Sequence, residues 1–129
     1  MPGKRRSVHV DGVEHGAPIP MGAVVGNILF SSGIGGIDPA NGIAPTDLGE
    51  QCELAFTNME KLLENAGGTV EDIGVIKVYL KDRSQRDAVN RPWLRMFPDE
   101  NNRPARHTVQ YDAFPPGILV QLEIIAVLG

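Results

Sequence analysis

The chain of 129 residues lacks the features that mark several protein classes. Cys52 is its one cysteine, which excludes a disulfide within the chain and a zinc site built from cysteines. No apolar run approaches the roughly 20 residues that a transmembrane helix needs, so we expect no membrane partner. Residues 1–4 lead into no long apolar region, so we expect no signal peptide and a cytoplasmic protein.

Basic and aromatic residues are also scarce. The net charge is −4, only 5% of the residues are aromatic, and residues 4–6 form one short basic cluster. Surfaces that bind nucleic acids combine positive charge with exposed aromatic rings, so we expect no nucleic-acid partner. The contents of 42% hydrophobic and 22% charged residues are ordinary for a globular protein, and the length predicts a single domain over residues 1–129.

The first third of the chain predicts β-structure and loops. Residues 7–10 fit a short strand, and residues 23–25 and 28–32 fit the two arms of a hairpin around Gly26-Asn27. The glycine-rich loop at residues 33–42 lacks the spacings of phosphate-binding loops, so its glycines indicate tight turns and close backbone contacts.

A helix is predicted after this loop. Asp47 can cap it, with Glu50 as the return half of a capping box, and Gly67-Gly68 can end it. Cys52 belongs to its apolar stripe, which favours a buried core residue over a nucleophile. The stripe follows the helical spacing and comprises Cys52, Ala55, Met59, Leu62, Leu63 and Ala66.

The second half predicts a strand, a helix and two further strands. Residues 73–81 form the first strand, and Ser84 caps a helix that starts with residues 85–90 and is interrupted at Pro92. Residues from Arg106 onward and residues 119–128 form the last two strands. This order predicts an α+β fold, a mixed β-sheet with two helices packed on one face.

The other face of that sheet is expected to be polar. We place Thr108, Gln110, Gln121 and Glu123 on the face away from the helices. This face is too apolar elsewhere to be purely solvent-exposed, so we expect it to meet other subunits.

Arg106 is the first candidate for function. It opens a strand directly after Pro104, and a guanidinium held there presents a fork of donors that matches a carboxylate. The spacing alone favours a surface ion pair, and both interpretations stay open at this point.

Eight motifs in order resemble the reactive-intermediate deaminase family, also called Rid, YjgF-like or endoribonuclease L-PSP-like. The resemblance runs from about residue 17 to the end and leaves residues 1–16 as a divergent segment. The motifs are residues 26–33, residues 38–42, Gln51 with Asn58, residues 66–68, residues 78–82, residues 88–90, Pro104-Ala105-Arg106 and residues 123–126.

The resemblance implies both a fold and an activity. It implies a chorismate-mutase-like α+β fold in which three subunits form a trimeric barrel with clefts between neighbours. It implies hydrolysis of enamine and imine intermediates to 2-oxo acids and ammonia, on a small-molecule carboxylate substrate, with no metal and no organic cofactor.

The resemblance also assigns roles to single residues. Arg106 matches the arginine that grips the substrate carboxylate. Ser32 and Gly33 match the loop that lines the cleft, and Asn90 matches an asparagine near it. For these three a purely structural role fits as well. Trp93 lies where the family often has an aromatic residue, and we expect it to pack in the core.

Three positions depart from the family pattern. Ile19 stands where many deaminases have a tyrosine, and Thr108 where a cysteine is common. Gln121 replaces the glutamate that positions the attacking water, while Glu123 matches a second acid. Glutamine can orient water but cannot take its proton, so the substrate is expected to differ from the standard small imino acid. We count Gln121 and Glu123 with Arg106 as catalytic candidates, and Ile19 and Thr108 as substrate-binding candidates.

Several readings remain open. The first is a deaminase for a longer or less polar substrate, such as 2-aminomuconate, which some family members hydrolyse. The second is a carboxylate-binding trimer without turnover, and the third is a ribonuclease, which the acidic charge disfavours. His15 and His107 are considered as ligand-contacting groups, with a structural or surface imidazole as the alternative for both.

Overall fold

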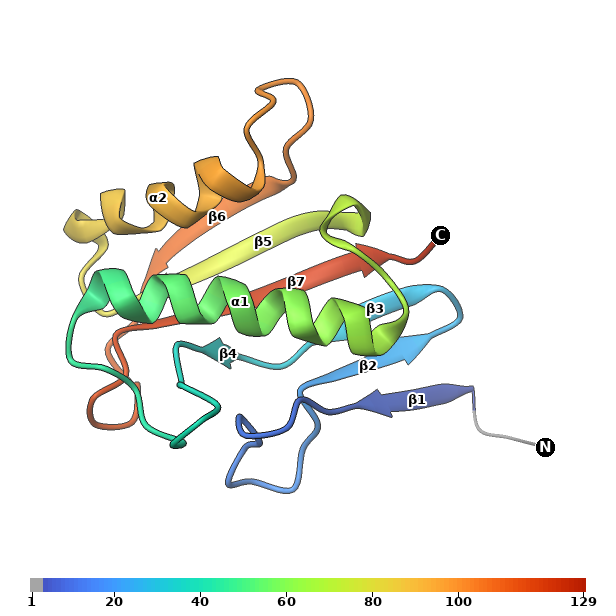
Figure 1. The fold of residues 1–129 in the computed structure, drawn as a ribbon, viewed down its shortest axis with the longest axis horizontal. Helices are drawn as coiled ribbons and strands as arrows, with labels where there is room; N and C mark the ends of the chain where they lie inside the picture. The colour runs from blue at the N-terminus through green and yellow to red at the C-terminus, as the bar shows by residue number, and fades with distance from the viewer. Residues whose placement is uncertain (1–3) are drawn as a thin grey trace.

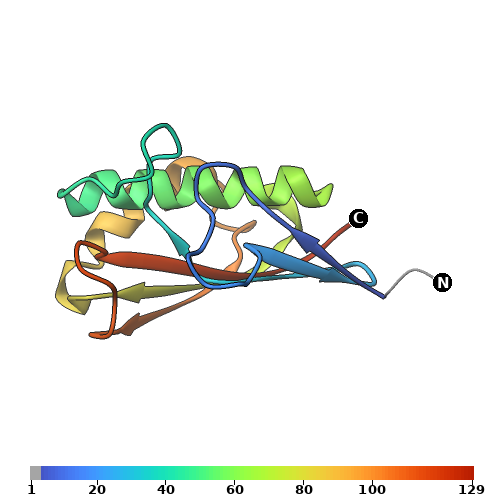
Figure 2. The same ribbon diagram turned by 90° about the horizontal axis from the view of Figure 1, so that it is seen from below.

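The computed structural model describes residues 4–129 as one layer of strands covered on one side by two helices (Figures 1 and 2). The sheet order is β1-β2-β3-β7-β5-β6, and the short β4 pairs with β7. All pairs are antiparallel except β5 with β6, so the sheet is mixed, as predicted. The elements are β1 Arg5–Val8, β2 Gly22–Val25, β3 Ile28–Ser31, β4 Ile34–Gly35, α1 Leu48–Ala66, β5 Ile73–Leu80, α2 Asp87–Met96, β6 Ala105–Gln110 and β7 Val120–Val127, with 3-10 turns η1 Val70–Asp72 and η2 Arg83–Gln85.

The core lies between the sheet and α1. Side chains alternate along β7, so its even-numbered residues from Val120 to Ala126 are buried under the helix. The predicted stripe of α1 is also buried, including Cys52 with no exposed surface. Burial, together with a smaller effect of the Glu53 charge, raises the pKa of the Cys52 thiol to about 12, so Cys52 is a core residue as predicted.

The ends of α1 follow the sequence signals closely. The Asp47 carboxylate accepts a hydrogen bond from the Glu50 N–H at 2.9 Å, which satisfies one of the unpaired donors of the first turn. Within the described residues the return bond from the Glu50 side chain is not formed, so only half of the predicted capping box is present. Gly67 ends the helix at φ 91°, a conformation that favours glycine.

Two boundaries differ from the prediction. The first strand is Arg5–Val8 and not residues 7–10, because its partner β2 begins at Gly22, opposite Val8. Ser84 does not cap the second helix; Asp82 accepts the Ser84 N–H at the start of η2. Pro92 lies inside α2 without interrupting it, because burial of its ring beside Trp93 offsets one missing backbone hydrogen bond.

The face assigned to β6 was wrong. Strand β6 pairs in parallel with β5, so that Arg106, Thr108 and Gln110 lie opposite residues 76, 78 and 80. Those three β5 residues are buried beneath the helices, and paired residues point to the same face of a sheet. Thr108 and Gln110 therefore lie on the helix side together with Arg106, whereas Gln121 and Glu123 lie on the open face as predicted.

Candidate functional site

Arg106 is held from three sides at the edge of the sheet. Its Nη1 donates to Asn90 Oδ1 at 2.8 Å, and its Nε donates to Thr108 Oγ1 at 3.1 Å. The guanidinium carbon lies 5.2 Å from the centroid of the Trp93 ring, a cation–π distance. We call Arg106, Asn90, Trp93 and Thr108 the arginine cluster.

The arginine cluster contains an unneutralised charge. Burial lowers the pKa of the Arg106 guanidinium, and the positive charge of Arg86 lowers it further, yet an arginine stays protonated near neutral pH. Among residues 4–129 the only ion pairs are Lys61–Glu64 and Arg95–Glu53, so Arg106 has no carboxylate partner. Its Nη2 group also has no hydrogen-bond partner in this part of the chain. A half-buried guanidinium with an unused donor can bind an external carboxylate.

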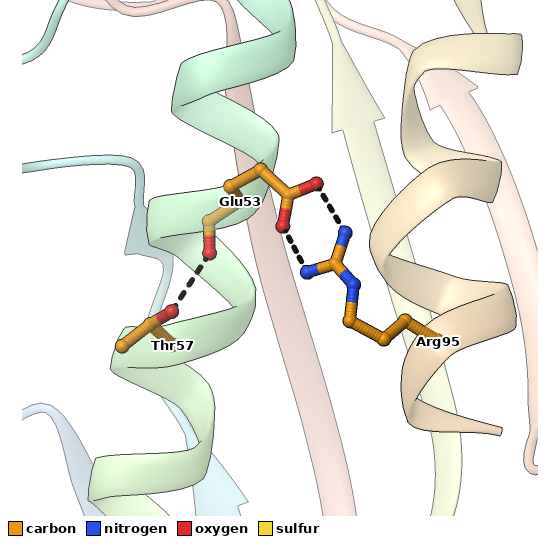
Figure 3. A network of polar contacts seen from close by, with 3 residues as sticks. All are labelled: Glu53, Thr57 and Arg95. Carbon is orange, nitrogen blue, oxygen red and sulfur yellow. Dashed lines mark hydrogen bonds and ion pairs between the residues drawn. The ribbon is translucent and has the colours of Figure 1, made fainter.

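A salt bridge fixes the helix that carries Asn90 and Trp93. Arg95 of α2 donates from Nη1 and Nη2 to the two carboxylate oxygens of Glu53 of α1, at 2.6 and 2.7 Å (Figure 3). Thr57 Oγ1 donates to the Glu53 carbonyl one turn along α1, at 3.0 Å. The bidentate pair ties α2 to α1 and so sets the position of the arginine cluster above β6.

A second group of candidates lines a cavity on the open face of the sheet. We call it the carboxylate cavity because Glu123 is the one acid in its lining. Its volume is about 310 Å³, enough for a small organic acid. It is lined by Ser31, Ser32, Gly33, Tyr79, Tyr111, Gln121 and Glu123.

Tyr79 holds the carboxylate of this cavity. Residues Tyr79 and Gln121 lie opposite each other in β5 and β7, with Glu123 two residues further along. The Tyr79 hydroxyl donates to Glu123 Oε1 at 2.7 Å, and this hydrogen bond raises the pKa of the phenol. Tyr79 therefore stays protonated and fixes the orientation of Glu123, which keeps further lone pairs for another donor.

The loop after β3 is shaped around Gln121. A Cβ at Gly33 would lie 2.6 Å from Gln121 Oε1, so the Gln121 amide packs directly against the Gly33 backbone in this conformation. The adjacent Ser32 donates from Oγ to the Pro20 carbonyl at 2.8 Å, which ties this loop to the segment that contains Ile19. Ile19 itself is 48% exposed and lines neither the cavity nor the arginine cluster.

Gln51 holds the turn that leads into β7. Its side chain is buried, donates to the carbonyls of Pro45 and Gly117, and accepts from the Leu119 N–H. All of its hydrogen-bonding groups on the amide are used, so it fixes the backbone two residues before Gln121. The sequence marked Gln51 as a motif residue but gave no role for it.

The predicted site residues thus form two groups and not one. Asn90 and Thr108 meet Arg106 on the helix side, while Ser32, Gly33, Gln121 and Glu123 meet on the open face. Within one chain the sheet separates the two groups.

The remaining predictions have mixed outcomes. Trp93 is buried in the core as expected, but it also stacks on Arg106. His107 lies opposite Lys77 on the open face of the sheet, away from Arg106. The Nε2 atom of His15 is buried and lacks a hydrogen-bond partner in the described chain, and His15 does not line the carboxylate cavity.

Tyr79 and Arg86 were not singled out by the sequence. Tyr79 faces outward by the alternation of its strand, but its contact with Glu123, 44 positions away, depends on the pairing of β5 with β7. Arg86 precedes a helix whose start the sequence misplaced. Among residues 4–129 no group of three metal-ligating side chains gathers, and no helix there is long and apolar enough to span a membrane.

Comparison with known proteins identifies the family. The model of the family described as endoribonuclease L-PSP matches residues 19–128. The chain belongs to this family. The match confirms the resemblance to Rid proteins and spans both the arginine cluster and the carboxylate cavity.

Named relatives and a solved structure agree with this assignment. The 3-aminoacrylate deaminase RutC of Acinetobacter baylyi is 30% identical over 117 residues, which cover 86% of this chain and 91% of the relative. The 2-iminobutanoate/2-iminopropanoate deaminase of Escherichia coli is 31% identical over 111 residues, with coverages of 85% and 87%. The crystal structure of RidA from a Psychrobacter species matches with a TM-score of 0.87 at 28% identity and covers 95% of this chain and 99% of that one. This similarity confirms the predicted Rid-like α+β fold.

Proposed function

We propose that this protein hydrolyses an enamine or imine of a carboxylic acid to a 2-oxo acid, or a related oxo acid, and ammonia. The observation that carries the proposal is the Arg106 guanidinium, half-buried, oriented by Asn90 and Thr108, and without a carboxylate partner among residues 4–129. The names of the two deaminases that are about 30% identical support the same reaction class.

We propose that the complete site forms between copies of the chain in a homotrimer. The arginine cluster and the carboxylate cavity lie on opposite sides of one sheet, so a second copy has to supply the missing half. The open face supports such packing because it exposes large apolar side chains, which a protein rarely leaves in water. These are Phe30, Val109, Tyr111, Ile125 and Val127, each between 38% and 53% exposed.

The chemistry assigns a role to each group. Arg106 of one copy binds the substrate carboxylate, and the cavity of the next copy receives the imine carbon. Gln121 orients the attacking water and Glu123 takes its proton, with Tyr79 holding Glu123 in place. Ser32 and Gly33 form the wall of the cavity. Ile19 does not line it, and its role toward a longer substrate rests only on the hydrogen bond that ties Ser32 to the neighbouring Pro20.

The atoms of this step balance without a cofactor. The water oxygen bonds to the carbon of the protonated imine, and one water proton moves to Glu123. The resulting carbinolamine receives that proton on nitrogen, the C–N bond breaks, and the hydroxyl proton leaves with the ammonia. The products are the 2-oxo acid and an ammonium ion.

The substitution at Gln121 favours a substrate other than the standard small imino acid. Orientation of water by an amide suffices only for an imine that is already strongly electrophilic. We therefore propose a non-standard enamine or imine acid, of which 2-aminomuconate is one candidate. The same substitution supports one alternative, a carboxylate-binding protein without turnover.

Ammonia release tests this proposal directly. Imino acids are generated fresh in the presence of wild type, Arg106→Ala, Arg106→Lys and the control Arg91→Ala. Arg91 is an exposed arginine of the same helix as Asn90 and lies beside a different depression. Wild type and the control should accelerate ammonia release. Arg106→Ala should bind the 2-oxo acid product about ten- to a hundredfold more weakly than wild type, and Arg106→Lys should recover only part of that affinity. If wild type binds the 2-oxo acid but does not accelerate ammonia release, the protein is the carboxylate-binding alternative without turnover. If Arg106→Ala binds the 2-oxo acid as tightly as wild type, the proposal is wrong.

A further inference from the structure

A cavity beside α1 lies apart from both groups of candidate residues. Its volume is about 390 Å³, within the range of sites for small molecules. One wall comes from α1, and the others come from the loop after β1 and the loop before α1. We call it the α1 cavity, and the lining residues used below are Val10, Asp11, Pro39, Asn58, Lys61 and Asn65.

Contacts within a single chain hold the walls of the α1 cavity in place. Asn65 Nδ2 donates to the His9 carbonyl at 2.8 Å, which ties the loop after β1 to α1. A Cβ at Gly12 would lie 2.5 Å from the Pro39 oxygen, so the backbones of the two loops pack directly against each other. The α1 cavity therefore belongs to the fold of one copy and needs no second copy to complete it.

Asn58 supplies a hydrogen-bond acceptor that the chain itself does not use. The residue is only 2% exposed, and its Nδ2 donates to the carbonyls of Gly35 and Ile37 at 3.0 and 2.8 Å. These two bonds use both amide protons and fix the side chain. Asn58 Oδ1 accepts no hydrogen bond from residues 4–129. Because a buried polar atom is costly without a partner, the α1 cavity favours a ligand that brings a donor.

Two opposite charges also line the α1 cavity without pairing with each other. Among residues 4–129, Asp11 forms no ion pair, and Lys61 Nζ lies 3.6 Å from Glu64 Oε2. The side chains of Lys61 and Glu64 are both 58% exposed, so this pair contributes little and leaves Lys61 able to bind another anion. A ligand that carries both an ammonium group and a carboxylate complements Asp11 and Lys61 together.

We propose that the α1 cavity binds a free α-amino acid with an apolar side chain. The ammonium group donates to Asn58 Oδ1 and to the Asp11 carboxylate, and the carboxylate of the ligand accepts from Lys61. The apolar side chain contacts Val10 and Pro39. This binding is reversible and does not depend on the proposed deaminase activity.

Three probes of similar size test whether both charges of the ligand are needed. Wild-type assembly is titrated calorimetrically with L-leucine, with 4-methylpentanoate, which lacks the ammonium group, and with 3-methylbutylamine, which lacks the carboxylate. We expect L-leucine to bind roughly tenfold more tightly than either analogue. Arg106→Ala is titrated in parallel and should keep the full affinity for L-leucine, because Arg106 lies outside the α1 cavity.

Variants of the two charged residues show where L-leucine binds. Lys61→Gln and Asp11→Asn should each weaken L-leucine binding roughly tenfold. Both side chains are at the surface, so the melting temperature should stay close to that of wild type. Lys81→Gln is the matched control, since it removes the same charge from an exposed lysine outside the α1 cavity, and it should keep the wild-type affinity.

Nuclear magnetic resonance adds a readout of position. The side-chain amide signals of Asn58 and Asn65 should shift when L-leucine is added, while the amide signal of Asn90 in the arginine cluster should not. A shift at Asn90 alone, or loss of L-leucine binding in Arg106→Ala, would place the amino acid at the arginine cluster and overturn the inference.

The remaining outcomes are equally decisive. Equal binding of the three probes, or no binding of L-leucine to wild type, would overturn the amino-acid site. A similar loss in Lys81→Gln would mean general electrostatic attraction and would also overturn it. None of these results affects the proposed function, which rests on Arg106.

Discussion

At the scale of single residues, the open question is how a site with glutamine at position 121 handles a proton. Glu123 is the one carboxylate of the cavity, and it is fixed by a neutral phenol. A base that is held in place needs no reorganisation when water attacks, so loss of Tyr79 should affect turnover more than binding.

Tyr79→Phe tests this role while keeping the ring and its edge contact with Tyr111. The variant should lower kcat about three- to tenfold, with unchanged affinity for the 2-oxo acid, because one hydrogen bond to a charged group is lost. Tyr111→Phe is the control, since its ring lines the same cavity without a hydrogen bond to Glu123. Equal turnover in wild type and Tyr79→Phe would show that Glu123 works without the phenol.

At the scale of elements, the position of α2 depends on its link to α1. The hydrogen bonds from Arg95 lower the pKa of Glu53, although this pair is largely exposed. A lowered folded-state pKa stabilises the fold above the ordinary carboxyl range and loses this contribution as pH falls through the folded pKa.

Glu53→Gln should therefore lower the melting temperature near pH 7 by about 1–3 °C, a small amount because exposed ion pairs contribute little. The difference from wild type should shrink as the pH falls below the ordinary carboxyl range and through the lowered pKa of Glu53, where wild type also loses the charge. Thermal melts at several pH values measure this, with Glu60→Gln on the same helix as the control. A difference that stays constant across pH would assign the effect to packing and not to charge.

The elements also show which parts of the fold the sequence could predict. The β2–β3 hairpin and α1 were predicted because their signals are local: a two-residue turn, a capping aspartate and a glycine in the left-handed region. The side of the sheet on which Thr108 and Gln110 of β6 lie was not predicted correctly. The alternation of side chains separates two faces of a strand but does not tell which face meets the helices. Only the parallel pairing with β5 decides that, and it joins residues about 30 positions apart.

The same distinction between local sequence signals and distant strand pairing applies to the candidate site. The residues of each cluster could be found one by one from family motifs, yet their distribution over two sides of the sheet follows from the pairing of β6. The Tyr79–Glu123 contact is likewise a product of strand register. Residue types were predictable, and their juxtaposition across distant strands was not.

At the scale of the whole molecule, the open sheet face should determine both assembly and activity. Ile125 lies opposite Phe30 on this face, and both are more than 40% exposed in the single chain. Light scattering of wild type should give three times the 13.9 kDa of one chain. Ile125→Glu should give a smaller species without deaminase activity, while Leu94→Glu, equally apolar and exposed but on α2, should remain trimeric.

A mixing experiment then asks whether the site is shared between copies. Arg106→Ala and Glu123→Gln each remove one half of the proposed machinery, so each alone should be inactive. If the halves come from different copies, unfolding and refolding the two variants together creates some interfaces with an intact Arg106 facing an intact Glu123. A random equal mixture should recover about a quarter of the wild-type rate. If each chain carried its own complete site, every site would still lack one group, and the refolded mixture would remain as inactive as the separate variants.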